Sequence, residues 1–329
     1  MTVKVIEYAK FGAPFGVCKC IEVDDPAPPQ ANEVLVAVEA SAINPADLLM
    51  IRGEYPGPNT FPARQGIEGV GRIISVGSDV EEHIVGDRVL LLGRGNWVEK
   101  VVCSADQVIR IPENIDLLQA AQMKANPPSA YFMLHDFVDL EEGDWIIQNA
   151  ANSAVGQHVI RLAKKMDIKT INIVRRAESI SILKAIGADF VFVDGDDLGE
   201  RVRSEIGDVH VPLAIDAAGG KPCEHLADCL SNGGVVVNYG FLDGKPCMIT
   251  PTHTIVRQIS LTGFWLFDRL SNQSKEEIKN IYTEMSGLFV SGVLHSPVEA
   301  TYRLDQVTKA LAHAERGGRD GKILFLMKD

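Results

Sequence analysis

The chain has 329 residues, about twice the roughly 100–200 residues of one typical domain, so two domains are the first expectation. Hydrophobic residues make up 46% of the chain and charged residues 23%, which excludes a disordered, collagen-like or coiled-coil protein. The 32 basic and 44 acidic residues give a formal net charge of −12. This excess of negative charge argues against nucleic acid and anionic membranes as partners.

The termini and the cysteines indicate a protein of a reducing compartment. The first ten residues read as an alternating strand rather than as a signal peptide. No apolar run approaches the ~18 residues that would cross a bilayer. Six cysteines are too few for a disulfide scaffold, and no two of them have Cys-x-x-Cys spacing. We therefore expect a cytoplasmic protein.

Short alternating runs of apolar residues predict β-strands in the first part of the chain. Such runs occupy 34–38, 71–76 and 87–92, and Gly, Pro and Asp turns separate them. From residue 3 to about residue 122 the sequence predicts an irregular β-rich domain.

After about residue 123, strands and amphipathic helices alternate. The predicted strands are 145–148, 169–174, 190–193, 212–216 and 235–239. This alternation predicts a parallel sheet covered by helices on both faces, with a ligand crevice at the carboxyl ends of the strands. The remaining predicted elements are the buried end of a strand at 261–266, a helix at 274–291, and closing elements at 305–315 and 322–326.

The turn that follows the strand at 145–148 is a candidate phosphate-binding turn. It consists of small residues and leads into a helix predicted at 157–166, whose N-terminal N–H groups favour a pyrophosphate. Of the three glycines in the G-x-G-x-x-G pattern, however, the chain keeps only Gly156, so an ordinary βα turn is an equal alternative. The cofactor contacts predicted in this turn are Asn152, Ser153, Ala154, Val155 and Gly156.

The end of the next strand favours NADP(H) over NAD(H). About 20 residues past the turn, where an acidic residue would bind the ribose hydroxyls of NAD, the chain has Arg175 and Arg176. Two guanidinium groups suit a 2′-phosphate, although two solvated loop arginines are the alternative. We assign to the same crevice the residues that end or follow the strand at 235–239, namely Tyr239, Gly240, Phe241 and Leu242.

Six segments carry a family pattern: 44–47, 51–56, 126–131, 148–157, 171–175 and 263–266. Through them the chain resembles the medium-chain dehydrogenase/reductase superfamily, and within it the zinc-independent 2-enoyl thioester reductases of the mitochondrial enoyl reductase type. The Asn152-Ser153 phrase is the more telling, because quinone reductases of the superfamily usually have a glycine-richer turn. The resemblance implies an α/β fold. A Rossmann-type doubly wound parallel sheet domain would span 123–292, and a β-rich GroES-like catalytic domain would combine 1–122 with 293–329.

The resemblance also frames the question of a metal. Catalytic zinc in this superfamily needs a cysteine and a histidine, but the corresponding places hold Asn44 and Ile67. Structural zinc needs four clustered cysteines, and the spacing of the six does not supply them. We predict no metal, and we expect inert or buried thiols at Cys18, Cys20, Cys103, Cys223, Cys229 and Cys247.

Tyr55 is the catalytic residue that the resemblance implies. Reduction of an α,β-unsaturated thioester requires a hydride at Cβ and a proton at Cα, and a phenol with a pKa of about 10 remains protonated at neutral pH. Taken locally, a turn tyrosine beside Pro56 is the simpler interpretation, and the resemblance reverses that preference. Asn44, assigned to the substrate pocket, and Asp47 either orient the nicotinamide or the tyrosine loop, or only cap a helix.

The resemblance implies five further contacts. Phe264, Trp265 and Leu266 would border the nicotinamide, and the first two would also line the acyl pocket. Asn126 would contact the cofactor, and Lys322 would lie near its phosphates. Core packing is the alternative for Trp265, a helix start for Asn126 and a surface strand for Lys322.

These features together predict an NADPH-dependent reductase of the C2=C3 double bond of trans-2-enoyl thioesters of CoA or acyl carrier protein, active in fatty-acid metabolism. The alternative is quinone or alkenal reduction on the same fold, and a non-catalytic nucleotide-binding protein is a third possibility. Members of the family commonly form dimers through their cofactor domains, so the resemblance implies a homodimer.

Overall fold

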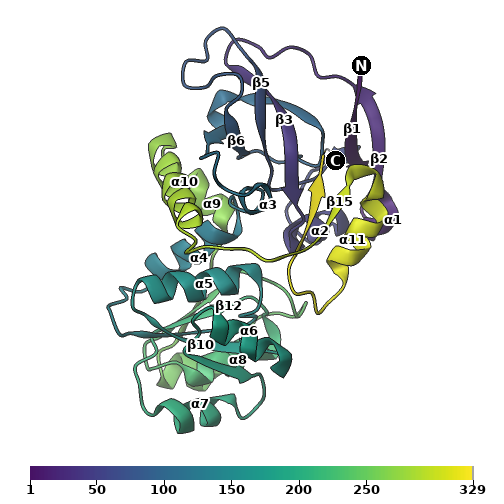
Figure 1. The fold of residues 1–329 in the computed structure, drawn as a ribbon. Helices are drawn as coiled ribbons and strands as arrows, with labels where there is room; N and C mark the ends of the chain where they lie inside the picture. Colours follow the sequence, from purple (N-terminus) through teal and green to yellow (C-terminus); the bar gives the residue numbers. More distant parts are fainter. Residues whose placement is uncertain (328–329) are drawn as a thin grey trace. The chain divides into compact units, whose positions relative to one another are not determined.

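The computed structural model describes residues 1–327, which form two compact units. The first unit contains Met1–Ala125 together with the chain from Ser274 onward, and the second contains Asn126–Gln273. The first unit is thus assembled from both ends of the chain, as the colours of Figure 1 show.

Two sheets form the first unit among the described residues. The larger has the order β15-β16-β3-β5-β6-β8 with β7 paired to β3, and its pairs are antiparallel except β15-β16. Its strands are β3 (Glu33–Ala42), β5 (Val70–Val76), β6 (Arg88–Leu91), β7 (Lys100–Ser104), β8 (Val108–Arg110), β15 (Val298–Arg303) and β16 (Lys322–Leu326). The smaller sheet consists of β2 (Cys18–Asp24), β1 (Thr2–Tyr8) and β4 (Ala63–Arg64).

Side chains alternate between buried and partly exposed along β3, and the buried ones belong to the core of the first unit. Val34, Val36 and Val38 of β3 are buried while the residues between them are partly exposed. They belong to one apolar cluster with Trp97 and Phe325, whose rings meet edge to face at 5.2 Å. Two predicted strands are confirmed, since 34–38 lies within β3 and 71–76 lies within β5. The strand predicted at 87–92 is also confirmed, and it forms over the slightly shorter β6.

Helices complete the first unit. They are α1 (Pro14–Val17), α2 (Pro45–Arg52), α3 (Leu117–Ala120), α10 (Lys275–Val290) and α11 (Val307–Glu315), with short 3-10 turns η1 (Ala105–Gln107) and η4 (Leu304–Gln306). In Figure 1 the C-terminal α11 lies beside the N-terminal α1. No helix within residues 1–327 has both the length and the apolar character that a membrane crossing requires.

The position of α10 corrects the predicted domain boundary. The helix forms as predicted, but contacts place it in the first unit, whereas the boundary at 292 put it in the nucleotide-binding domain. Its buried Tyr282 donates a hydrogen bond of 2.9 Å to the backbone carbonyl of Lys124, a residue of the first unit. Apolar periodicity predicted the helix but carried no information about this partner.

The second unit is a six-stranded parallel sheet in the order β11-β10-β9-β12-β13-β14. Numbered along the chain from β9, this is the strand order 3-2-1-4-5-6 of the dinucleotide-binding fold, with its topological switch between β9 and β12. The strands are β9 (Trp145–Gln148), β10 (Lys169–Val174), β11 (Phe190–Val193), β12 (Leu213–Asp216), β13 (Val235–Asn238) and β14 (Ser260–Gly263). The helices are α4 (Asn126–His135), α5 (Ala154–Lys165), η2 (Ala177–Ser179), α6 (Ile180–Ala185), α7 (Leu198–Ile206), α8 (Gly220–Cys229), the π-helical η3 (Thr252–Val256) and α9 (Leu266–Ser271).

The edge strand β14 differs from the prediction of a buried strand end at 261–266. All four residues of β14 are exposed, and the Trp265 side chain keeps 40% of its surface accessible. Because β14 is the last strand of the sheet, it has a neighbour on one side only. An apolar run usually indicates a buried segment, but no element within residues 1–327 covers this strand.

Candidate active site

The predicted phosphate-binding turn of the second unit connects β9 to α5. Ser153 is the N-cap of α5, and its hydroxyl accepts a hydrogen bond of 3.1 Å from the Gly156 backbone N–H. A Cβ atom at residue 156 would lie 2.6 Å from the Ala151 carbonyl oxygen, so only glycine fits there. The single glycine that the chain keeps is thus the one that close packing of helix and strand requires. Because the cap is Ser153, α5 begins at Ala154, before the predicted start at 157.

Tyr239 joins this turn from a distant part of the sequence. It follows β13, and its side chain is hydrogen-bonded to that of Ser153, while burial raises the pKa of its phenol. Gly240 comes next, and a Cβ atom there would lie 2.5 Å from the Ala217 carbonyl oxygen. The structure therefore brings together two predicted parts of the cofactor site, the turn after β9 and the loop after β13. Phe241 and Leu242 of that loop are exposed.

Arg175 and Arg176 directly follow β10, and both side chains are exposed. Neither guanidinium forms an ion pair with any residue in the described part of the chain. The carboxyl end of this strand is where the dinucleotide-binding fold reads the ribose. Two uncompensated cations at this position fit an additional phosphate better than a neutral hydroxyl.

Sequence reasoning missed a buried polar network at the topological switch point. The Asp216 carboxylate at the end of β12 accepts hydrogen bonds from the amides of Asn149, at 2.5 Å, and Asn238, at 2.8 Å. Asn149 in turn accepts a bond of 2.7 Å from the Ala217 backbone N–H. These side chains hold the ends of β9, β12 and β13 in register, and an acidic residue after a buried strand, followed by Gly219 and Gly220, was the signal for them.

Asn126 and Phe264 occupy defined places in the second unit. Asn126 is the first residue of α4 and is 8% exposed, and its side-chain Nδ2 is buried without a hydrogen-bond partner within residues 1–327. A buried unpaired donor is costly unless a ligand satisfies it. The Phe264 ring lies 6.4 Å from that of Phe132, and its N–H donates to the Asn238 carbonyl. Trp265 next to it contacts Phe267 at 5.2 Å and is not core packing.

In the first unit, Asn44 is bonded at both ends of its amide. It is the N-cap of α2, and its Nδ2 donates a hydrogen bond of 2.7 Å to Glu68. Its Oδ1 accepts a hydrogen bond from the Lys322 ammonium group of β16. Lys322 is 8% exposed, so the alternative of a surface lysine is wrong, while its role near cofactor phosphates stays a prediction. An ammonium group thus bonds the residue that stands in the place of a zinc ligand.

Asp47 and Lys124 complete this group, which we call the Asn44 cluster: Asn44, Asp47, Glu68, Lys124 and Lys322. Asp47 accepts hydrogen bonds from the N–H groups of Asn44 and Ile67 and from the Gln65 amide, at 2.8, 2.9 and 2.9 Å. Burial raises its pKa to about 6. Burial also lowers the pKa of Lys124 to about 7 and that of Lys322 to about 8. Capping by Asp47 is confirmed, and the cluster gives it a second role in holding α2.

Tyr55 follows this anchored helix closely. The helix ends at Arg52, Gly53 adopts a left-handed conformation with φ of 80°, and Tyr55 is half-buried just beyond it. The Asn44 cluster holds the N-terminus of α2, so the position of the turn with Tyr55 depends on it. The role of Tyr55 as proton donor stays a prediction at this point.

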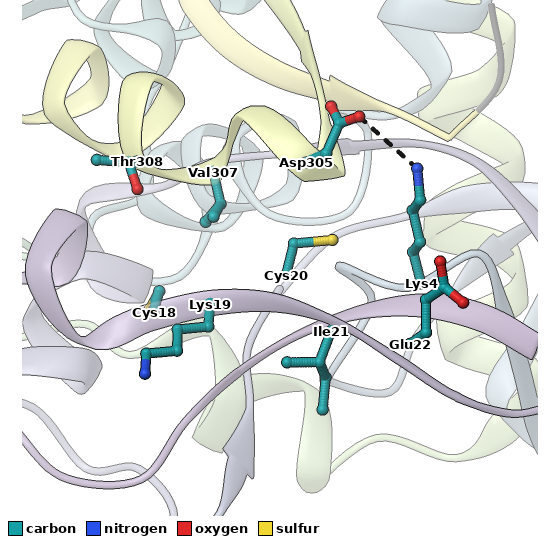
Figure 2. A pocket seen from close by; sticks show the side chains of 9 residues that line it. All are labelled: Lys4, Cys18, Lys19, Cys20, Ile21, Glu22, Asp305, Val307 and Thr308. Carbon is teal, nitrogen blue, oxygen red and sulfur yellow. Dashed lines mark ion pairs between the residues drawn. The ribbon is translucent and has the colours of Figure 1, made fainter.

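The hollow shown in Figure 2 belongs to the first unit and contains none of the predicted site residues. Strand β2 and the start of α11 line it, and Lys4 forms an ion pair of 3.7 Å with Asp305 across it. Both side chains are about 40% exposed, so this pair contributes little. We assign no function to this hollow.

Comparisons with known proteins define the class of the chain. Residues 30–113 match the family "Alcohol dehydrogenase GroES-like domain" and residues 154–284 match the family "Zinc-binding dehydrogenase". A solved structure described as a putative NADPH:quinone reductase from Bacillus thuringiensis superposes with a TM-score of 0.92 at 29% identity over the whole of both chains. A complex of Etr1p with NADP and crotonyl-CoA superposes with a TM-score of 0.90 at 25% identity, covering 99% of this chain and 100% of the other. These matches confirm a medium-chain dehydrogenase/reductase with a GroES-like and a Rossmann-type domain.

Relatives with similar sequences identify the family within this superfamily to which the chain belongs. A mitochondrial enoyl-[acyl-carrier-protein] reductase of Caenorhabditis elegans is 39% identical over 86% of this chain and 83% of its own length. The human protein of that name is 33% identical over 94% of this chain and 84% of its own length. The chain belongs to this enoyl reductase family, which confirms the predicted resemblance.

The two buried lysines generate a prediction about pH. The pKa of Lys124 is lower in the folded than in the unfolded chain, so above pH 7 the unfolded chain binds more protons and the free energy of unfolding rises with pH. One such proton contributes up to about 1.4 kcal/mol per pH unit. We expect Lys124→Met to reduce this rise between pH 7 and pH 9, measured by denaturant titration, with the remainder due to Lys322.

The exposed Lys309 on α11 provides the matched control. Lys309→Met should keep the wild-type rise in stability. Equal slopes for Lys124→Met and the wild type would contradict the assignment.

Proposed function

We propose that this protein reduces the C2=C3 double bond of trans-2-enoyl thioesters with NADPH. The observation that carries the proposal is its 39% identity to an enoyl-[acyl-carrier-protein] reductase over most of both chains. The similarity to the Etr1p complex with NADP and crotonyl-CoA supports it independently. Either carrier, CoA or acyl carrier protein, is compatible with these relatives, and fatty-acid metabolism is the process that such a reaction serves.

The second unit has the features that NADPH requires. The turn at 152–156 offers helix N–H groups to the pyrophosphate, and Arg175 and Arg176 offer two exposed cations to the 2′-phosphate. Asn126 has a buried amide donor that a ligand would satisfy. When bound, NADPH supplies the hydride that the Cβ atom of the substrate accepts.

Tyr55 supplies the proton. As hydride arrives at Cβ, negative charge develops on the thioester oxygen and at Cα, and the phenol, protonated at neutral pH, donates its proton to Cα. The Asn44 cluster positions the α2 helix from whose end Tyr55 extends. Phe264 and Trp265 line the acyl pocket, and the exposure of Trp265 leaves its indole available for an apolar ligand.

Replacing Tyr55 tests the mechanism. Tyr55→Phe removes only the hydroxyl, so we expect kcat for NADPH-dependent reduction of crotonyl-CoA to fall about 10²- to 10⁴-fold while NADPH binding is unchanged. Tyr302→Phe is the matched control, because the Tyr302 hydroxyl bonds His313 in the same unit and has no part in the proposal. A Tyr55→Phe enzyme with wild-type kcat would exclude Tyr55 as the donor.

Arg175 and Arg176 determine the choice of cofactor in this proposal. We expect Arg175→Ala/Arg176→Ala to raise KM for NADPH about 10- to 100-fold and to leave KM for NADH nearly unchanged, because each lost contact to the 2′-phosphate is a charge-assisted hydrogen bond. Steady-state kinetics with both cofactors measure this. Arg203→Ala, an exposed arginine on α7, should keep the wild-type preference. A parallel loss with both cofactors would point to a structural role instead.

Quinone reduction is the second candidate function. It is favoured by two structural neighbours, the putative NADPH:quinone reductase and the Escherichia coli quinone oxidoreductase complexed with NADPH, which superposes with a TM-score of 0.88 at 26% identity. A panel of crotonyl-CoA, longer enoyl thioesters, enones and quinones with NADPH discriminates between them by kcat/KM. A higher value for quinones would replace the thioester proposal, and turnover of none of them would leave a nucleotide-binding protein.

We propose a homodimer in which β14 pairs with its copy. An exposed edge strand presents unpaired backbone N–H and C=O groups. Exposed apolar side chains lie in this strand and in the η3 helix that precedes it in the chain: Leu261 at 38%, Ile255 at 75% and Val256 at 71% exposure. A heterodimer of Etr1p and Etr2p from Candida tropicalis is among the similar structures. Cytoplasmic location also stays a prediction, since the relatives are named as mitochondrial proteins.

Charged substitutions near the edge strand β14 test whether it forms the dimer interface. Leu261→Asp/Ile255→Asp would bury two carboxylates in the proposed interface, so we expect the mass from light scattering to fall from that of a dimer to that of one chain. Ile182→Asp, an apolar residue 47% exposed on α6, is the control and should remain a dimer. A monomeric wild type would overturn the proposal.

A further inference from the structure

Two cysteines and an aspartate from three separate segments meet in the second unit. Asp216 ends β12, Cys223 lies in the first turns of α8, and Cys247 lies in the loop after β13. One ligand atom from each, the two Sγ atoms and a carboxylate oxygen, lies within 4.8 Å of the other two. Sequence spacing gave Cys223 no partner, and only the fold brings Cys247 and Asp216 to it.

Among the described residues, the Asp216 carboxylate has only neutral hydrogen-bond partners. Asp216 is fully buried, and its hydrogen-bond donors are neutral: the amides of Asn149 and Asn238, the backbone N–H groups of Ala218 and Gly219, and the Cys247 thiol. Within residues 1–327 no lysine, arginine or histidine forms an ion pair with it. A buried carboxylate without a countercharge is costly, and a bound cation would remove that cost.

The sulfur–oxygen distance between Cys247 and Asp216 is close to the one that a shared zinc ion would give. Zinc binds thiolate sulfur at about 2.3 Å and carboxylate oxygen at about 2.1 Å, so tetrahedral geometry separates sulfur from oxygen by about 3.6 Å. The Cys247 Sγ atom lies 3.8 Å from Asp216 Oδ2. The Cys223 thiol is hydrogen-bonded to that of Cys247, so Cys247 contacts both of the other two residues. Hydrogen bonds hold the carboxylate in place: Asn149 donates to its Oδ1 atom and Asn238 to the Oδ2 atom that faces Cys247, and such bonds commonly orient metal ligands.

We propose that Asp216, Cys223 and Cys247 bind one thiophilic divalent cation, with zinc as the ion. On binding, each thiol loses its proton to water, two metal–sulfur bonds and one metal–oxygen bond form, and a water molecule completes the tetrahedron. This site is separate from the place of catalytic zinc in the superfamily, where the first unit has Asn44. Nothing is oxidised or reduced.

The ion would cross-link separate segments of the second unit. The loop between β13 and Cys247 begins with Tyr239, which is hydrogen-bonded to the phosphate turn, and Gly220 at the start of α8 donates to the Lys245 carbonyl at 3.2 Å. A metal joining Cys223 to Cys247 would tie this loop to α8 and to the end of β12. The thioester reaction itself needs no such ion.

Cadmium titration of the reduced full-length protein tests the proposal. The protein is freed of metal with a chelator, kept reduced with a phosphine, and titrated with Cd²⁺ alone while thiolate-to-cadmium charge-transfer absorption is recorded. We expect one equivalent per chain, displaced by Zn²⁺. Cys223→Ser and Cys247→Val should each weaken binding at least about 10-fold. Cys229→Ala, a buried cysteine on the same helix, should bind like the wild type.

The zinc-loaded wild type supplies a second readout that does not depend on any variant folding. X-ray absorption at the zinc edge should show two sulfur ligands at about 2.3 Å with oxygen completing the shell. No cadmium bound by the wild type, equal affinity in Cys223→Ser and the wild type, or a shell without sulfur would each overturn the proposal and leave a hydrogen-bonded thiol pair.

Discussion

The side-chain amide of Asn44 is the point on which the first unit depends. A buried amide must have both its donor and its acceptor satisfied, and here Glu68 accepts from it while Lys322 donates to it. These two partners come from opposite ends of the chain, and Glu68 also accepts from the Ala125 backbone N–H at 2.9 Å. Asn44 therefore links the C-terminal strand β16 to Glu68, and Glu68 extends this network to the last residue before the second unit. Asn44 is also the N-cap of α2, the helix that precedes Tyr55.

The second unit also has buried polar groups that need partners, and here amide side chains rather than lysines provide them. Its parallel strands end at one edge, where backbone groups and Asp216 need partners, and Asn149 and Asn238 provide them from the two neighbouring strands. These hydrogen bonds join the carboxyl ends of β9, β12 and β13. The turn at 152–156 and the loop at 239–242 meet at this edge of the sheet, where Tyr239 is hydrogen-bonded to Ser153.

Three acidic side chains of this protein are buried in its interior, where a carboxylate needs hydrogen-bond donors or a cation nearby. Asp47, Glu68 and Asp216 are all fully buried despite the net charge of −12. In the first unit, Lys124 and Lys322 lie in the same cluster as two of these carboxylates. In the second unit no cation plays that part for Asp216 within the described residues. The contrast between the two units distinguishes a closed structural cluster from a place that would accept a cation.

Local residue patterns determined much of this protein. The change from alternating to βαβ periodicity near residue 123 predicted two kinds of domain, and the strands from 145 to 238 lie within a residue of their predicted positions, because buried strands are continuous apolar runs bounded by turn residues. Six short segments, among them 126–131 and 148–157, carried the resemblance to the family. Only the tertiary structure placed α10 in the first unit, left β14 exposed, set Lys322 against Asn44 and brought Cys223 to Cys247. Each of these depends on contacts between segments far apart in the chain, and neither periodicity nor spacing records which distant side chains become neighbours once the sheets have closed.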